Sequence, residues 1–268
     1  MTPAVRSEWR KVTTTNLWWV LALVMFAYTA FLGAVMGFSL AQQPEAATGG
    51  MGDSALSGRE VAQSVYTLGA SLGYVFPLVA GALAMTSEFR HQTITPTLLF
   101  EPRRSVVLAA KLVVNLALGL VYGVIGTLGA IAGGAPVLAG LGDGMHLGDG
   151  EVLGNVAFSV LALAIWAVIG VGLGTLLPNQ VAAIVVILAF TQFVEPILRI
   201  GFAAVDALSG LARFFPGAAA EALVGSSLYS TTGMLDLLGR WEGAAVLLAY
   251  AVVFALVGRF TTLRRDVT

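Results

Sequence analysis

The sequence VVLAAKLVVNLALGLVYGVIGTLGAI, residues 106–131, is predominantly apolar along its whole length. A helix needs roughly 20 such residues to cross the roughly 30 Å hydrocarbon layer of a bilayer. The chain of 268 residues is 57% hydrophobic and only 11% charged. Soluble domains average about 45–50% apolar and about 25% charged residues. The sequence therefore predicts a membrane protein built from α-helices.

Five further segments have the length and composition of a spanning helix. With residues 106–131 they predict an all-α fold of six spans, over residues 17–40, 61–85, 106–131, 152–177, 181–198 and 243–257. The first run is longer than the roughly 7–15 apolar residues of a signal peptide, so we expect it to remain as an anchor. Residues 1–268 are expected to form a single transmembrane domain.

The positive charges indicate the orientation, because cytoplasmic connections hold an excess of Lys and Arg. One side carries Arg6, Arg10, Lys11, Arg90, Arg103, Arg104, Lys111, Arg259, Arg264 and Arg265. The other side carries Arg59, Arg199, Arg213 and Arg240. Both termini are therefore predicted to be cytoplasmic. The net charge of -1 indicates no nucleic-acid partner.

Residues 1–16 are expected to form a helix that lies in the inner membrane interface. Val5, Trp9 and Val12 recur at helical spacing, whereas the charged residues between them point elsewhere. Such a helix would place Trp9 at headgroup depth and its cations near anionic lipid. A solvated arm is the alternative.

Small residues spaced four apart predict close helix packing within the chain, with a dimer face as the alternative. These pairs are Gly33 and Gly37, Gly69 and Gly73, Gly119 and Gly123, and Gly170 and Gly174.

Several kinds of chemistry are excluded. The only two lysines, Lys11 and Lys111, follow Arg10 and Ala110, so no Gly-Lys-Ser/Thr phosphate loop exists. Both histidines lie in loops predicted on opposite sides of the membrane, which excludes a Ser-His dyad or an HExxH zinc site. The chain has no cysteine. We expect no enzyme activity, no metal site and no cofactor in this chain.

The sequence TQFVEPIL, residues 191–198, places Glu195 inside the fifth predicted span. An ionisable group in the membrane is costly and is a functional candidate by default. Pro196 follows directly and lacks a backbone donor, so we expect the span to break there. Glu195 then either satisfies freed backbone amides or acts in gating or along a substrate path.

Residues 199–242 are too polar to span the membrane and too apolar for a free loop. We expect an external, re-entrant segment in which two short helices dip into the outer leaflet, the second beginning near Pro216. Backbone at membrane depth is tolerated where it packs on protein or lines a cavity.

Taken together, the chain resembles the permeases of the ABC-2 family of ATP-binding-cassette transporters. The most specific resemblance lies before the third span, where Glu88, Phe89, Arg90, Thr93, Pro102, Arg103, Arg104 and Lys111 are similar to the family's acidic-aromatic-Arg, Thr and Pro-Arg pattern. The family usually has Gly where this chain has Gln92. The resemblance covers nearly the whole chain.

The resemblance implies that residues 86–105 form a cytoplasmic coupling segment that docks on a separate ATPase subunit. The docking residues it implies are Glu88, Phe89, Arg90, Thr93 and Leu98; a plain solvated loop is the alternative. ATP and magnesium would bind only in that partner. A second permease copy or a homologue would complete a complex in a bacterial plasma membrane, surrounded by lipid, that exports a lipophilic or amphipathic compound.

The transport path is expected to lie between the two copies. Its candidate polar residues are Tyr28, Thr29, Ser71, Tyr74, Thr191, Gln192 and Glu195, although a hydroxyl in a span also commonly bonds a backbone carbonyl. Two rival hypotheses are an ion- or proton-coupled secondary transporter that uses Glu195, and an assembly subunit without transport of its own.

Overall fold

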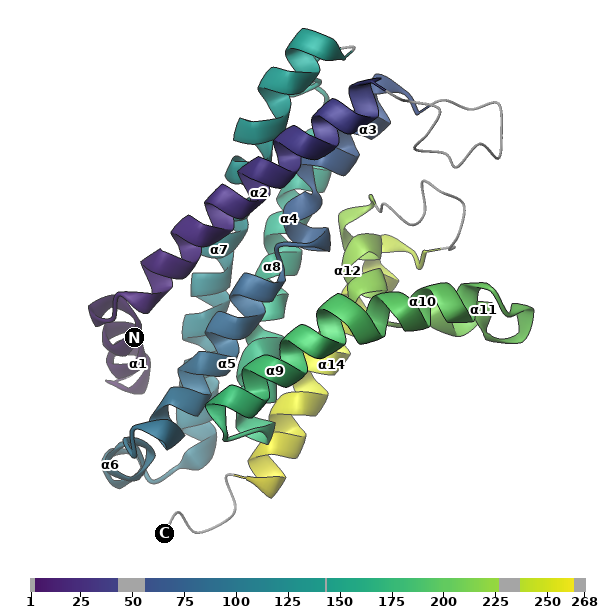
Figure 1. Ribbon diagram of the computed structural model, residues 1–268. Helices are drawn as coiled ribbons and strands as arrows, with labels where there is room; N and C mark the ends of the chain where they lie inside the picture. The colour runs from purple at the N-terminus through teal and green to yellow at the C-terminus, as the bar shows by residue number, and fades with distance from the viewer. Residues whose placement is uncertain (1–2, 43–55, 143, 227–236, 263–268) are drawn as a thin grey trace.

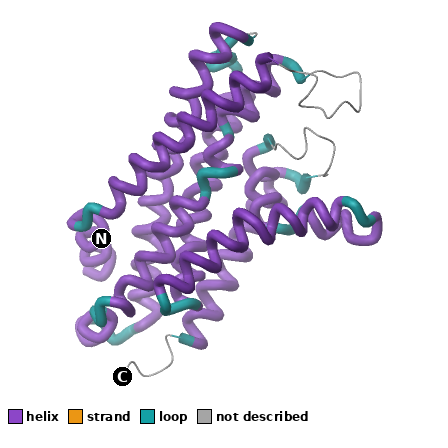
Figure 2. Tube along the Cα trace, viewed as in Figure 1, coloured by secondary structure: helices purple, strands orange, loops and turns teal. Residues whose placement is uncertain are grey.

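The computed structural model in Figure 1 describes residues 3–42, 56–142, 144–226 and 237–262. Within these ranges the chain forms helices and connecting loops, with no strand (Figure 2). Most of the helices run side by side in an elongated bundle. α1 (Pro3–Thr14), α6 (Ile94–Phe100) and the last turns of α14 (Arg240–Thr261) lie at the same end of this bundle (Figure 1).

Five helices in the described residues are long and apolar enough to cross a membrane. They are α2 (Leu17–Gln42), α7 (Arg104–Leu141), α8 (Gly150–Leu176), the helical run Gln180–Phe202, and α14. They correspond to the first, third, fourth, fifth and sixth predicted spans. α7 has 38 residues and is about 57 Å long, so it extends well beyond a hydrocarbon layer of roughly 30 Å.

The second predicted span, residues 61–85, is not one helix. The stretch divides into α3 (Gly58–Tyr66), α4 (Leu68–Ser71) and α5 (Val75–Arg90). Pro77 explains the second break, because the ring of a proline clashes with the carbonyl four residues earlier, here that of Gly73. The chain therefore turns at Gly73 before α5 begins.

The fifth predicted span keeps its helical path where the sequence predicted a break. α9 (Gln180–Ala189) continues through a π-helical turn, η2 (Phe190–Val194), into α10 (Glu195–Ala203). The Glu195 amide donates to the carbonyl of Phe190, five residues earlier. Pro196 then occupies the first turn of α10, where its missing donor is not required. The wider turn replaces the expected break.

The stretch after α10 contains two short helices, α11 (Asp206–Ala212) and α12 (Pro216–Val224). The helix predicted to begin near Pro216 is thus confirmed. Every residue of α12 is buried, and the helix packs on α14, where a Cβ at Gly243 would lie 2.6 Å from the Ala219 carbonyl oxygen. α10 and α11 instead extend away from the bundle (Figure 1).

The paired small residues pack against helices of the same chain. A Cβ at Gly33 of α2 would lie 2.5 Å from the Ala130 oxygen of α7, and one at Gly123 of α7 would lie 2.8 Å from Cα of Val160 in α8. Contacts this short leave no room for a side chain. The expectation of close packing within the chain is therefore confirmed.

Candidate functional site

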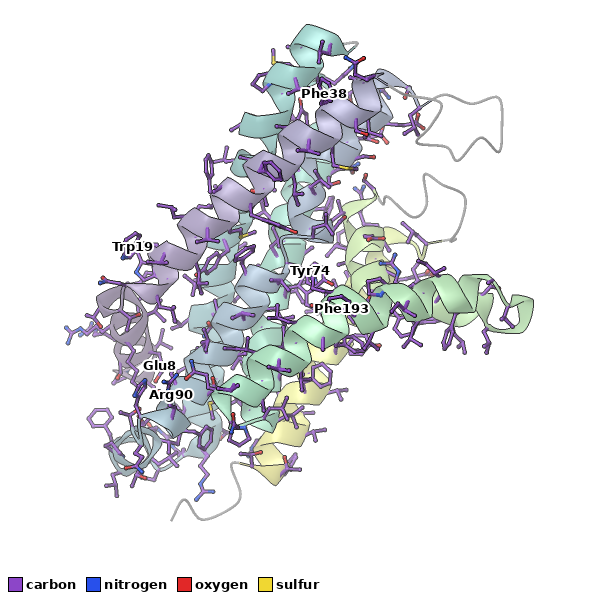
Figure 3. The ribbon with its side chains drawn as sticks, viewed as in Figure 1. Glu8, Trp19, Phe38, Tyr74, Arg90 and Phe193 are labelled. Atoms are coloured by element: carbon purple, nitrogen blue, oxygen red, sulfur yellow. The ribbon has the colours of Figure 1, made fainter. Side chains whose placement is uncertain are left out.

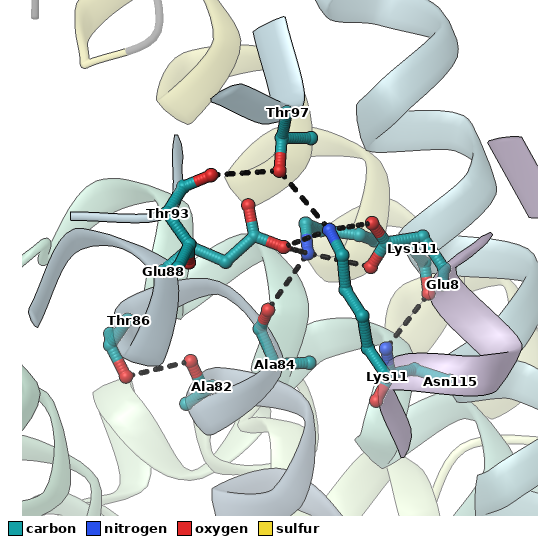
Figure 4. Close-up of polar contacts among 10 residues, drawn as sticks. All are labelled: Glu8, Lys11, Ala82, Ala84, Thr86, Glu88, Thr93, Thr97, Lys111 and Asn115. Atoms are coloured by element: carbon teal, nitrogen blue, oxygen red, sulfur yellow. Dashed lines mark hydrogen bonds and ion pairs between the residues drawn. The ribbon is translucent and has the colours of Figure 1, made fainter. Parts of the chain in front are cut away.

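Four charged side chains meet where α1, α5 and α7 come together (Figure 4). The ammonium of Lys111 lies 2.7 Å from Oε2 of Glu8 and 2.6 Å from Oε1 of Glu88. The ammonium of Lys11 lies 2.6 Å from Oε1 of Glu8 and 2.7 Å from Oε1 of Glu88. We call Glu8, Lys11, Glu88 and Lys111 the charge cluster. It contains two carboxylates and two ammonium groups, so its formal charges cancel.

The charge cluster is largely withdrawn from solvent. Lys111 is 1% exposed, Glu88 is 4% exposed and Glu8 is 6% exposed. Burial alone would lower the pKa of Lys11, but the hydrogen bonds and charges of Glu8 and Glu88 outweigh it and raise that pKa. Burial alone would raise the pKa of Glu88, but Lys111 and Lys11 together lower it. Both groups are therefore held in their charged forms.

The charge cluster also reaches α6. The Lys11 ammonium donates to Oγ1 of Thr97 at 3.2 Å, and the Lys111 ammonium donates to the Ala84 carbonyl at 2.9 Å. α6 is a short helix that follows α5 after a turn in which Gln92 has a φ of 57°. The family resemblance leads one to expect Gly at this position. Gln92 thus adopts the left-handed conformation that glycine enters without cost.

The five predicted docking residues differ in how far their side chains are buried. Glu88 is buried in the charge cluster. Phe89 and Leu98 are half-buried against Met85, Ile94 and Leu108. Arg90 and Thr93 are exposed, and Arg90 Nη1 donates to Oε1 of Gln180 at 3.2 Å (Figure 3).

The most exposed apolar residues of this region are Leu99 and Phe100, at the end of α6. They are 78% and 76% exposed. Large side chains left this open at the tip of a short helix are candidates for contact with another molecule.

Sequence reasoning did not find Glu8, Lys11 and Lys111 as a unit. On α1, Glu8 was grouped with the charged residues that point away from Val5, Trp9 and Val12, yet it is the buried residue of this helix, while Trp9 is 39% exposed. Lys111 was counted as a positive charge on the cytoplasmic side and as part of the family pattern, but no partner was assigned to it. A signal was present, because Lys111 lies within a predicted span, where an ionisable residue requires a partner.

A second polar region is a cavity of about 250 Å³ between α4, α5, the fifth spanning run and α12. Five of the predicted pathway residues line it: Ser71, Tyr74, Thr191, Gln192 and Glu195. Its other lining residues are Leu72, Pro196, Arg199, Gly217 and Glu221. Residues far apart in sequence are thus brought to one site.

The other two predicted pathway residues lie elsewhere. Thr29 is buried in α2 and donates to the Met25 carbonyl at 2.9 Å, which is the alternative expected for a hydroxyl in a span. The Tyr28 ring packs on the Phe76 ring at a centroid distance of 5.6 Å. Neither lines the cavity.

Charged and backbone groups organise the cavity wall. Arg199 Nη2 lies 2.6 Å from Oε2 of Glu221, and both side chains are buried. The amide of Gly217 donates to Oε1 of Glu195 at 2.6 Å. This amide belongs to the first turn of α12, whose donors have no partner within the helix. Glu195 therefore satisfies freed amides, as one reading of the sequence expected, but those amides come from α12 instead of its own span.

The aromatic side chain of Tyr74 forms another part of the wall. Tyr74 is labelled in Figure 3. Its hydroxyl donates to the Thr191 carbonyl at 3.2 Å, and its ring stacks on Trp166 at a centroid distance of 4.4 Å. Thr191 lies in the π-helical turn directly before Glu195, and such turns are frequent at functional sites. Arg199 and Glu221 were missed as site residues, because sequence reasoning assigned both to the external segment.

No group of three or more potential metal ligands occurs within the part of the chain that the structure describes. A family model described as ABC-2 family transporter protein matches residues 3–267, a range that includes the charge cluster and the cavity. No curated protein matches the chain.

Proposed function

The chain belongs to the ABC-2 family of transporter proteins, and we propose that it exports a lipophilic or amphipathic compound, using ATP hydrolysed by a partner. Permeases of this family are membrane subunits without catalysis of their own, and they generally pair with ABC ATPase subunits. The absence of a phosphate loop from the sequence agrees with this division of work.

The observation that carries the proposal is the construction of α6. This helix presents Leu99 and Phe100 outward, while the Thr97 hydroxyl connects it to the charge cluster. We propose that the ATPase binds α6, with Arg90 and Thr93 at the edge of the contact and Phe89, Leu98 and Glu88 supporting it from within. Movement of α6 would then reach α1, α5 and α7 together, because the charge cluster joins them.

We further propose six passages through a bacterial plasma membrane, with both termini in the cytoplasm. α3, α4 and α5 would together form the second passage, because they run from the far end of α2 back toward α6 (Figure 1). α4, which lies between the two turns, contacts α7, α8 and α12, and irregular backbone at membrane depth is tolerated where it packs on protein. A second permease copy would complete the pathway.

The test is co-purification of the full chain with its candidate ATPase in mild detergent, with ATP hydrolysis recorded. The variant combines Leu99→Ala and Phe100→Ala. The control combines Leu120→Ala and Val121→Ala, two exposed residues of α7. We expect the α6 variant to lose about tenfold or more of the ATPase affinity, since exposed anchor side chains carry much of an interface's energy. The control should assemble as the wild type does.

Three results would contradict the proposal. If the ATPase binds both variants equally, α6 is not the docking element. If no ATPase binds the wild type and transport follows a proton or sodium gradient, the secondary-transporter hypothesis replaces the proposal. Transport that survives every substitution in the cavity wall would instead favour an assembly subunit.

A further inference from the structure

One carboxylate oxygen of Glu195, Oε2, takes no part in the contacts that hold this side chain in place. Glu195 is 1% exposed, and Oε1 accepts the Gly217 amide. Oε2 is buried and has no hydrogen-bond partner among the described residues. A buried charged oxygen without a partner is costly, so it takes up a proton or is compensated by a water molecule, a cation or another ligand.

The charges around the cavity indicate which ligand would compensate this oxygen. Two carboxylates, Glu195 and Glu221, and one guanidinium, Arg199, line the cavity. Arg199 is bound to Glu221 through two of its nitrogens, at 2.6 and 3.3 Å. With Glu195 ionised, the side chains that line the cavity carry one negative charge in excess. A single positive charge would balance it.

The shape and the other walls favour an organic cation. The volume of about 250 Å³ is below the roughly 300–1,000 Å³ of pockets that enclose a whole drug-sized ligand, so it suits a head group. The Tyr74 ring borders the cavity, and aromatic faces attract ammonium ions. The helical run that carries Glu195 also presents Phe193 and Ile197, each 66% exposed, and an apolar tail could lie along these two side chains.

We propose that this cavity binds the positively charged head group of an amphiphile that carries one cationic nitrogen, with Glu195 as the anionic partner. This inference rests on the proposed function, because it names the class of compound that the transporter carries. Gly217 contributes by allowing the carboxylate to approach α12, since a Cβ there would lie 2.5 Å from Glu195 Oε1.

The test uses two probes of nearly equal shape. Decyltrimethylammonium carries a permanent positive charge, whereas decyldimethylamine N-oxide is neutral near neutral pH. Binding of each to the full chain, reconstituted in nanodiscs with its ATPase, is measured by calorimetry, and the heat from protein-free nanodiscs is subtracted. We expect the wild type to prefer the cation by about tenfold or more, the effect of a charge-assisted contact.

Glu195→Gln keeps the shape of the side chain and removes its charge, so this preference should disappear. The control, Glu151→Gln, removes an exposed carboxylate elsewhere and should keep the preference. Equal binding of both probes by the wild type would overturn the inference, because the site would then not recognise the positive charge. Unchanged cation binding by Glu195→Gln would also overturn it. The wild-type comparison holds even if that variant does not fold.

The same preparation separates the two proposals. If the ATPase assembles and hydrolyses ATP but the probes bind equally, only the inference about the substrate fails. If the cation is preferred but no ATPase associates, the proposed mode of transport fails and the cation site remains.

Discussion

At the scale of single residues, Lys111 shows why a lysine can be kept inside a membrane protein. Its ammonium contacts two carboxylates and a backbone carbonyl, which together satisfy its three donor hydrogens. Removal of one partner from such a buried pair costs about 3–5 kcal/mol, because the remaining charge is left uncompensated. The four residues of the charge cluster therefore depend on one another, and they join α1 to α5 and α7.

The pKa shifts in the charge cluster predict how the attachment of α1 depends on pH. The pKa of Glu88 is lowered from its ordinary value of 4.5, so its contribution to stability is present above 4.5 and is lost as the pH falls through the lowered value. The pKa of Lys11 is raised from 10.5, so its contribution is present below 10.5 and is lost as the pH rises through the raised value. We expect α1 to stay attached at pH values between the lowered pKa of Glu88 and the raised pKa of Lys11. It should detach at more acidic and at more alkaline pH.

This prediction can be measured as the distance between spin labels at Thr13 on α1 and Leu116 on α7, in a chain that has no native cysteine to label. A label pair at Leu128 of α7 and Leu161 of α8 serves as the control for the bundle. The distance from α1 should lengthen below pH 4.5 while the control distance holds. A constant distance at both extremes of pH would show that charge does not hold α1.

At the scale of elements, contact between helix backbones sets the packing of the bundle. α7 lies between α2 and α8, and it approaches each through glycines. In lipid there is no hydrophobic force between helices, so close approach of backbones and van der Waals contact provide the association energy. The same property explains why α7 contains so many residues that are poor helix formers in water.

Gly123→Ala tests this packing. The added Cβ would lie 2.8 Å from both Cα and the carbonyl oxygen of Val160, so the two backbones must separate. Overpacking of this kind costs about 1–3 kcal/mol. The matched control is Gly140→Ala in the same helix, where nothing lies within 4 Å of the added Cβ.

We expect the thermal unfolding temperature in detergent to fall for Gly123→Ala. Gly140→Ala should leave it unchanged or raise it, because alanine favours the helix by about 1 kcal/mol over glycine. Equal behaviour of the two variants would mean that the contact between α7 and α8 is not as close as the structure places it.

At the scale of the whole molecule, the charge cluster and the cavity lie in different parts of the bundle. The first joins α1 and α6 at the end predicted to face the cytoplasm, and the second lies between α4, α5 and α12. α5 connects them, because Glu88 is near its end and Tyr74 directly precedes its start. A displacement of α6 along α5 would therefore move one wall of the cavity.

Thr97→Val tests this connection. The substitution keeps the shape of the side chain on α6 and removes the hydroxyl that accepts a hydrogen bond from the Lys11 ammonium. We expect ATPase binding and ATP hydrolysis to persist, while transport per ATP falls by about tenfold or more, the effect of one hydrogen bond to a charged group. Thr95→Val, at an exposed site on the same helix, is the control. If ATP hydrolysis fell together with transport, Thr97 would act in ATPase binding instead of in this connection.

The sequence by itself determined the membrane class, the segments that became α2, α7, α8, the fifth run and α14, and the family resemblance. These features follow from local composition and spacing, because a long apolar run must satisfy its backbone within a helix wherever it lies in lipid. The same local reasoning placed Ser71, Tyr74, Thr191, Gln192 and Glu195 as one polar path, and these five share the cavity.

Only the tertiary structure decided which polar groups satisfy one another. Glu8 is paired with Lys111 and Glu195 with the first turn of α12, and each contact joins residues distant in sequence. It also decided that the stretch over residues 61–85 bends and that the chain passes Pro196 through a π-helical turn. Burial removes water as the alternative partner, so each buried charge must find its complement in another helix, and helix composition alone does not specify that choice.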